Sequence, residues 1–178
     1  MPTHNFHQTI GAVVTKETFP NCDEIVKDSA CGGKQEVPLF YTETKSNETK
    51  IAQVDLLIIQ NSKVKVIIEI EESGDLPTKV FGKFFASAFS KYYIHWTKKN
   101  VPVSLSNSTS FIQIMDTSKK SIASSKMKQF AFIEEAIQMG LPSGKFKTYN
   151  LIYGSESEFE PGGSKRDELI TLIKQALE

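Results

Sequence analysis

Two consecutive apolar segments constrain the fold of this chain more than any other feature of its sequence. They are residues 51–60 (IAQVDLLIIQ) and 64–71 (VKVIIEIE), with the turn-forming residues Asn61 and Ser62 between them. Both are rich in β-branched residues, which predicts two strands joined by a short turn. Because nearly every residue is apolar, both strands are expected in the centre of a sheet that is covered on both faces.

The rest of the chain alternates between strand and helix patterns. A β-rich segment at 37–43 precedes the two strands, so the three are predicted to form an antiparallel meander. After Pro77, apolar residues recur every four positions from Val80 to Tyr93, which predicts an amphipathic helix of about four turns. Further along we predict strands at 101–105 and 111–116 joined by a polar loop at 104–110, a helix at 125–139, a strand at 146–153, and a helix at 165–177 capped by Ser164.

This order of elements predicts an α/β fold, in the form of an α+β sandwich. A short helix is expected between His4 and Lys16, and the whole pattern indicates a mixed central sheet that begins with the antiparallel meander and carries helices on both faces. A chain of 178 residues is the usual size of one domain, so residues 1–178 are expected to form a single domain.

Composition excludes several classes of protein. The chain has 21 basic and 21 acidic residues, so bulk positive charge cannot hold it to nucleic acid, although a local basic surface can. No apolar run approaches the length of a membrane span, and the N-terminus lacks the features of a signal peptide. Cys22 and Cys31 are too few for a disulfide framework, although one disulfide between them stays an alternative. We therefore expect a cytoplasmic protein with no membrane partner and no organic cofactor.

Three carboxylates stand out because they interrupt the apolar strands. Asp55 lies within the first strand, and Glu69 and Glu71 lie near the end of the second. A buried carboxylate is costly unless it is paired, protonated or bound to a metal. Glu69 and Glu71 are two residues apart, so their side chains share one face of the strand. Carboxylates that converge at one end of a sheet favour a hard cation such as Mg²⁺.

The register of the two strands decides whether Asp55 can join this group. A strict two-residue turn pairs Gln60 with Lys63 and places Asp55 opposite Ile68, on the wrong face. A three-residue loop, or a bulge near Asp55, places Asp55 opposite Glu69. Asn61-Ser62 lacks the glycine that tight hairpin turns prefer, which favours the longer loop.

These residues resemble the motif of the PD-(D/E)xK nuclease superfamily, which includes restriction endonucleases, junction resolvases and repair nucleases. The resemblance runs from about residue 37 to 93, with Val54-Asp55 in place of Pro-Asp and Glu69-Ile70-Glu71 in place of (D/E)xK. It implies a restriction-endonuclease-like fold and a catalytic Mg²⁺, for which Mn²⁺ can substitute. Asp55, Glu69 and the main-chain carbonyl of Ile70 would be the metal ligands.

The chain departs from this motif at Glu71, where the superfamily has lysine. Glu71 is interpreted as a residue that orients or deprotonates the attacking water, or that binds a second metal. Lys79 or Lys83, early on the following helix, could supply the missing cation, and we prefer Lys83. Glu43 in the preceding strand is a second-tier acidic candidate.

Local charge favours a polyanionic partner. Residues 79–147 contain eleven lysines and three acidic residues, a formal charge of +8 within a neutral chain. Such asymmetry is typical of a nucleic-acid-binding face. The candidate phosphate-binding residues are Lys79, Lys83, Lys98, Lys99, Lys119 and Lys120.

The sequence therefore predicts a Mg²⁺-dependent DNA endonuclease that hydrolyses phosphodiester bonds by metal-activated water. A type II restriction endonuclease acting as a homodimer on double-stranded DNA is the leading subclass, because two strands need two sites. The alternatives are a structure-selective or repair nuclease, a catalytically inactive module that binds nucleic acid or protein, and a structural protein whose carboxylates are incidental.

Three other features are assigned ordinary structural roles. The pair His4 and His7 has helical spacing for a metal but lies at a terminus, so we interpret it as frayed surface. His95-Trp96 is interpreted as a packing element, and the acidic segment 154–163 as a surface loop.

Overall fold

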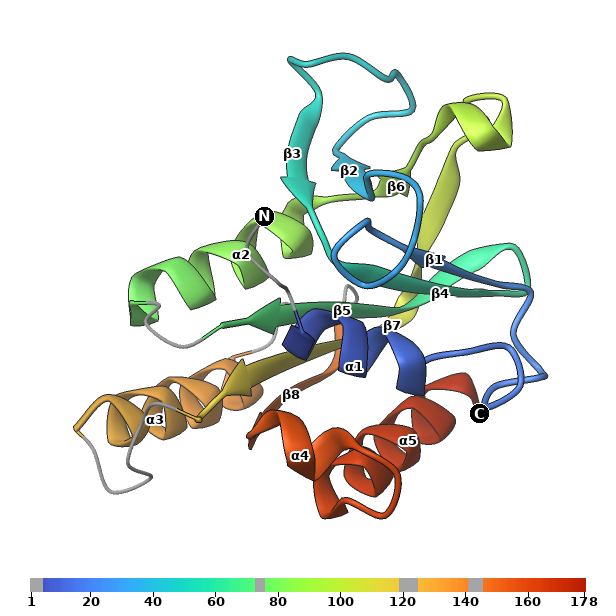
Figure 1. Cartoon of the computed structure of the whole chain (residues 1–178). Coiled ribbons are helices and arrows are strands. Elements are labelled where there is room, and N and C mark those ends of the chain that lie inside the picture. The colour runs from blue at the N-terminus through green and yellow to red at the C-terminus, as the bar shows by residue number, and fades with distance from the viewer. Residues whose placement is uncertain (1–4, 73–75, 119–124, 141–145) are drawn as a thin grey trace.

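A computed structural model describes residues 5–72, 76–118, 125–140 and 146–178 of the chain, and it shows an α/β protein with a mixed eight-stranded sheet (Figure 1). The strands are β1 (Glu24–Lys27), β2 (Pro38–Phe40), β3 (Lys50–Gln53), β4 (Leu56–Gln60), β5 (Lys63–Glu71), β6 (Tyr92–Tyr93), β7 (Val103–Asp116) and β8 (Phe146–Gly154). Their order is β1-β4-β5-β7-β6-β2-β3, and β8 pairs with β7. β5, β7 and β8 run parallel, and the other pairs are antiparallel.

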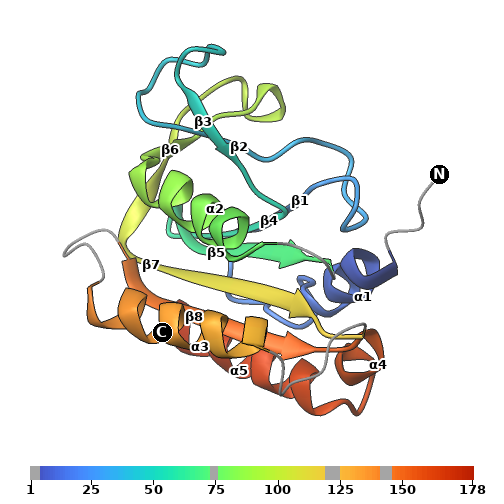
Figure 2. The same cartoon turned by 90° about the vertical axis from the view of Figure 1, so that its left-hand side faces the viewer.

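Helices cover both faces of the sheet, as predicted. The helical elements are α1 (Asn5–Val13), α2 (Pro77–Phe89), the 3-10 helix η1 (Trp96–Lys98), α3 (Ser125–Met139), α4 (Glu156–Phe159) and α5 (Ser164–Leu177). α2 and α3 share one core with the sheet, through residues such as Phe84 and Phe130. α1 and α5 share the other core, through residues such as Ile10 and Ile173. Figure 2 shows α2 and α3 in front of the sheet. No helix in the described parts of the chain is long and apolar enough to cross a membrane.

The predicted first strand, 51–60, is broken into β3 and β4 at Val54 and Asp55. The Val54 N–H donates to the Val37 carbonyl at 3.0 Å, whereas the Asp55 carbonyl accepts from the Asp28 N–H at 2.9 Å. These bonds lead to different segments, so the chain bends here and passes from the β2–β3–β6 part of the sheet to the β1–β4–β5 part. Asp55 consequently lies at the bend rather than inside a continuous strand.

The polar segment 104–110 is not a loop, so that prediction was wrong. It belongs to β7, a single strand of 14 residues that runs through both predicted strands. Ser104 pairs with Tyr92 of β6, and after a register shift Ser110 pairs with Val66 of β5. Thr109 Oγ1 lies 2.9 Å from the Val64 carbonyl and 2.7 Å from the Ser106 carbonyl, so one buried hydroxyl proton serves two backbone acceptors at the irregularity.

Several other helix and strand boundaries differ from the predicted ones. The helix predicted to reach Tyr93 ends at Phe89, because Tyr92 and Tyr93 pair with β2 and β7 as the short strand β6. Strand β1 and helix α4 were not predicted, although Ser155 and Glu158 form a capping box that starts α4. α5 includes Ser164 as its first residue, and Gly163 is its N-cap. The bounds of α3 match the prediction.

The β4–β5 turn contains two residues, so the predicted longer loop was also wrong. Asn61 and Ser62 have φ of 52° and 57°, the left-handed conformation of a primed hairpin turn. The Ser62 N–H donates to Asp23 Oδ2 at 2.8 Å, which helps to hold this strained turn without a glycine.

A bulge then restores the register that brings Asp55 and Glu69 together. Ile59 pairs with Val64 but Ile58 pairs with Val66, so Lys65 is an extra residue in β5. Beyond the bulge Leu56 pairs with Ile68, and the next position along each strand is Asp55 and Glu69. The metal hypothesis allowed a bulge near Asp55, and the observed bulge lies farther along the ladder, opposite Ile58 and Ile59.

Replacing Ser62 with glycine tests the strained turn. Glycine adopts a positive φ without steric cost, so Ser62→Gly should raise the free energy of unfolding by about 1 kcal/mol. Ser62→Ala is the matched control, because it removes the same hydroxyl but keeps the strain. Urea unfolding of the three proteins measures the difference, and equal effects of glycine and alanine would contradict the strained turn.

Candidate active site

The C-terminal end of strand β5 carries two buried carboxylates that lie under helix α2. Glu69 and Glu71 are each 1% exposed and lie on the same face of the strand. Lys83 of α2 reaches this face, with its Nζ 3.3 Å from Glu69 Oε2 and 2.9 Å from Glu71 Oε1. α2 is held there by its apolar side, which buries Val80 and Phe84 in the core. One ammonium group therefore lies between two carboxylates.

Asp55 joins this group from the bend between β3 and β4. Its Oδ2 accepts a hydrogen bond of 2.6 Å from the N–H of Ile70, which fixes the carboxylate against the end of β5. The N–H and C=O of a strand residue point to the same neighbour, so the Ile70 carbonyl also faces the Asp55 side. The carboxylate of Asp55 is close enough to raise the pKa of Glu69. The register therefore produces the Asp55–Glu69 pair that the sequence spacing predicted.

Burial dominates the electrostatics of this pair. Burial raises the pKa of Glu69 well above its usual value, and the charge of Asp55 raises it further, while Lys83 opposes the shift. Burial also raises the pKa of Asp55, although the Ile70 N–H, His7 and Lys83 lower it in part. One shared ammonium group neutralises only part of the negative charge of two neighbouring carboxylates. A divalent cation between them would supply the missing charge.

Lys83 keeps its own charge in this environment. Burial alone lowers the pKa of the Lys83 ammonium, but the carboxylates of Glu69 and Glu71 outweigh burial and raise that pKa above its ordinary value. Lys83 is therefore a cation at neutral pH, next to the residues that the resemblance assigns to catalysis.

A buried relay behind Glu71 was missed by the sequence analysis. The Tyr149 hydroxyl donates to Gln113 Oε1 at 2.8 Å, and Gln113 Nε2 donates to Glu71 Oε1 at 3.1 Å and to the Val80 carbonyl at 2.9 Å. The Val80 carbonyl can only accept, so it fixes the NH2 end of the amide on the side of Glu71. Glu71 Oε1 thus accepts from both Gln113 and Lys83, so Glu71 anchors the lysine. The available signal was a glutamine inside the apolar segment FIQIMD of β7.

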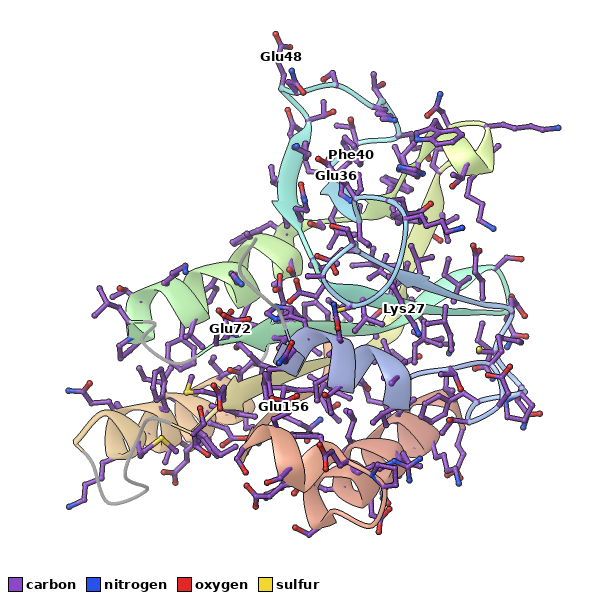
Figure 3. All side chains as sticks on the ribbon, in the orientation of Figure 1. Lys27, Glu36, Phe40, Glu48, Glu72 and Glu156 are labelled. Atoms are coloured by element: carbon purple, nitrogen blue, oxygen red, sulfur yellow. The ribbon has the colours of Figure 1, made fainter. Side chains whose placement is uncertain are left out.

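His7 also belongs to this region, which corrects its interpretation as frayed surface. It is 8% exposed within α1, and its Nδ1 lies 3.2 Å from Glu72 Oε1 and its Nε2 3.9 Å from Asp55 Oδ1. Phe6 seats the helix by packing edge-on against Phe159 at 5.5 Å. Figure 3 labels Glu72 at this end of β5. His4 lies outside the described residues.

The donor set suits a magnesium ion, although it has two carboxylates rather than three. Among the described residues, no three His, Cys, Asp or Glu side chains come together in a way that could hold a metal ion. Asp55, Glu69 and the Ile70 carbonyl remain as oxygen donors, and Mg²⁺ is commonly held by one or two carboxylates with water completing its shell. Glu71 is paired with Lys83 instead.

The lysines proposed to bind DNA are only partly gathered at the site. Lys79 is exposed on α2, four residues before Lys83 and on the same side of the helix. Lys98 forms an ion pair with Glu24, which pairs with Ile59 at the end of β4 remote from Asp55. Lys99 follows η1 and is exposed. Lys119 and Lys120 lie outside the described residues.

The acidic candidate Glu43 does not join the site. It is exposed and accepts a hydrogen bond from Tyr92.

Comparison of the chain with protein-family models, curated proteins and solved structures found no match to any of them. The geometry and charges of the site are therefore the basis for a functional proposal.

Removing the buried charge of Glu69 should stabilise the protein near neutral pH. The folded state raises the pKa of Glu69, so the folded protein binds this proton more tightly and loses stability as pH rises through that pKa. Glu69→Gln should therefore raise the free energy of unfolding by on the order of 1 kcal/mol at about pH 7, with no gain at about pH 4. Urea unfolding in a chelator measures this. Glu160→Gln, at an exposed position, is the control, and a loss of stability at neutral pH would show that the Lys83 pair outweighs burial.

The tyrosine relay gives a second prediction. Tyr149→Phe leaves the buried Oε1 of Gln113 without its donor, which should cost about 1–3 kcal/mol of stability. Tyr153→Phe is a matched control, because the Tyr153 hydroxyl is buried with no hydrogen-bond partner among the described residues. Thermal unfolding should show a clear loss for the first variant and none for the second. Equal effects would mean that the relay adds nothing beyond packing.

Proposed function

We propose that this protein is a Mg²⁺-dependent nuclease that hydrolyses phosphodiester bonds in DNA. One observation carries the proposal: Asp55 and Glu69 occupy the positions next to the Leu56–Ile68 pair of β4 and β5, and the Lys83 ammonium lies 3.3 Å from Glu69. The three groups come from a bend, a strand and a helix, and none of them forms part of the apolar core.

The chemistry of the donors supports this assignment. Asp55, Glu69 and the Ile70 carbonyl would hold the cation, and Mn²⁺ would substitute because it also accepts oxygen ligands. When bound, Mg²⁺ supplies positive charge that offsets the charge of the phosphodiester and makes the attacking water more acidic.

The chain's own groups then have distinct roles. The Ile70 N–H keeps Asp55 in one orientation, so the ligand pair is organised before substrate binds. Lys83 provides a cation that can stabilise negative charge as it develops on the phosphate. Glu71, held by Gln113, keeps Lys83 at the site. Lys79, exposed on the same side of α2, would contact the DNA backbone.

Lys83 also bears on the choice between an enzyme and an inactive module. The inactive alternative was supported by the missing lysine at position 71. The ammonium of Lys83 reaches Glu71 at 2.9 Å from the neighbouring helix, which favours an active enzyme. Type II restriction cleavage by a homodimer on double-stranded DNA stays the leading prediction for the subclass, with a structure-selective or repair nuclease as the alternative.

Cleavage of plasmid DNA tests the proposal directly. The wild-type protein should nick or linearise supercoiled plasmid in Mg²⁺ or Mn²⁺, and a chelator should stop the reaction. Asp55→Ala, Glu69→Ala and Lys83→Met should each lower the cleavage rate by about a hundredfold or more, because each removes a charge needed at the reacting phosphate.

Matched controls keep this test specific. Glu160→Ala and Lys174→Met change exposed residues of the same types outside the site and should leave the rate unchanged. DNA binding without cleavage in either metal would favour the inactive module. Absence of both binding and cleavage at low salt would favour the incidental interpretation of the carboxylates.

A further inference from the structure

We define the upper lobe of the molecule as β2, β3, β6 and η1 with their connections, of which Figure 1 labels the three strands. An open pocket of about 760 Å³ lies in this lobe. The groups of interest in its lining are Phe40, His95 and Trp96, together with Lys34, Lys45 and Lys50. Figure 3 labels Phe40 and Glu36 within this lobe. None of these residues belongs to the candidate active site.

Trp96 presents a large aromatic surface to this pocket. It is the only tryptophan of the chain and is 68% exposed, so the prediction that it serves packing was wrong. His95 is buried as predicted and stacks on Tyr93, with 6.3 Å between ring centroids and 6° between planes. The His95 ring lies 5.4 Å from the Trp96 ring, and its Nδ1 accepts from the Thr97 N–H to cap η1. The exposed indole is therefore carried by a fixed element.

The charge around the indole is positive. Lys34, Lys45 and Lys50 line the pocket and are all exposed, and Glu36 is the acidic residue in the same lining. The Nζ of Lys45 lies 3.3 Å from Asn100 Oδ1, which holds this ammonium at the rim of the pocket. Cations beside an exposed aromatic face suit a ligand that joins a flat ring to an anion. A nucleotide has both parts, and proteins that bind single strands combine stacking aromatics with basic residues in this way.

We propose that this pocket binds one unpaired nucleotide of a DNA strand, with its base stacked on Trp96 and its phosphates next to Lys45 and Lys50. The choice of DNA as the polymer rests on the proposed function. β3 begins at Lys50 and leads directly to Asp55, five residues further on, a distance of about 17 Å along an extended chain. A single strand that enters the pocket would have to span no more than this length to reach the active site. The pocket selects DNA with an unpaired segment near the cleavage position over uniform duplex.

Because Trp96 is the only tryptophan, intrinsic fluorescence reports on this pocket alone. The wild-type protein in a chelator, where cleavage cannot occur, is titrated with a short oligothymidylate. We expect saturable quenching of the tryptophan emission, weakened by added salt. Inorganic phosphate and a duplex without unpaired bases should give little quenching.

Variants give an independent readout through the anisotropy of a labelled oligothymidylate. Trp96→Ala should weaken binding about tenfold, because it removes the aromatic face on which the base stacks. The double change Lys45→Ala and Lys50→Ala should weaken binding and reduce its dependence on salt. Lys174→Ala is the matched lysine control and should change neither. Trp96 and the lysines are exposed, so circular dichroism should show an unchanged fold.

The outcomes separate this inference from the proposed function. Quenching by oligothymidylate without any plasmid cleavage in Mg²⁺ would support the pocket and contradict the nuclease. Cleavage without quenching, or unchanged affinity in Trp96→Ala, would overturn the pocket alone. Equal quenching by inorganic phosphate would show a simple anion site and would also overturn it, as would equal quenching by duplex.

Discussion

The burial of two facing carboxylates is the constraint on which the rest of the site depends. Asp55 and Glu69 lie at the end of two apolar strands, where burial disfavours their charged forms. Two contacts stabilise the charged forms: the Ile70 N–H donates to Asp55, and the Lys83 ammonium lies beside Glu69. These groups compensate only part of the charge, because Lys83 is shared with Glu71. Such incomplete compensation is costly for stability and is typical of sites that a ligand completes.

The pair exists because a strained turn and a bulge act together. A two-residue turn at Asn61-Ser62 alone would place Asp55 on the opposite face from Glu69. The extra residue, Lys65, shifts the register by one and reverses that outcome. Bulges often occur next to active sites, where they redirect a side chain. In this chain the bulge lies a few residues before the site, and its effect reaches the site through the ladder between β4 and β5.

Local sequence patterns predicted much of the fold and the side chains of Asp55, Glu69 and Lys83 as members of one candidate site. The sequence was sufficient to predict strand β5, helix α3 and the carboxylates, because apolar periodicity and charge within apolar segments are local signals. The bend at Asp55, the continuity of β7 and the place of His7 depend on hydrogen bonds to segments distant in sequence. Gln113 meets Glu71 only because β7 lies parallel to β5. No spacing along the chain reports such a contact.

The position of Lys83 shows that a motif describes spacing along the chain, whereas a site depends on where the charged groups lie in space. In the superfamily motif that the chain resembles, the lysine follows two residues after the acidic ligand, on the same strand. Here that strand position holds Glu71, and the ammonium arrives from α2 instead. The requirement at a reacting phosphate is a positive charge at a certain point, and Coulombic interactions do not depend on which element supplies it. Glu71 is the anion that holds Lys83, and Gln113 and Tyr149 lie behind it. Under the proposed function, Glu71 at the place of the motif lysine and Lys83 on α2 together form one compensated arrangement.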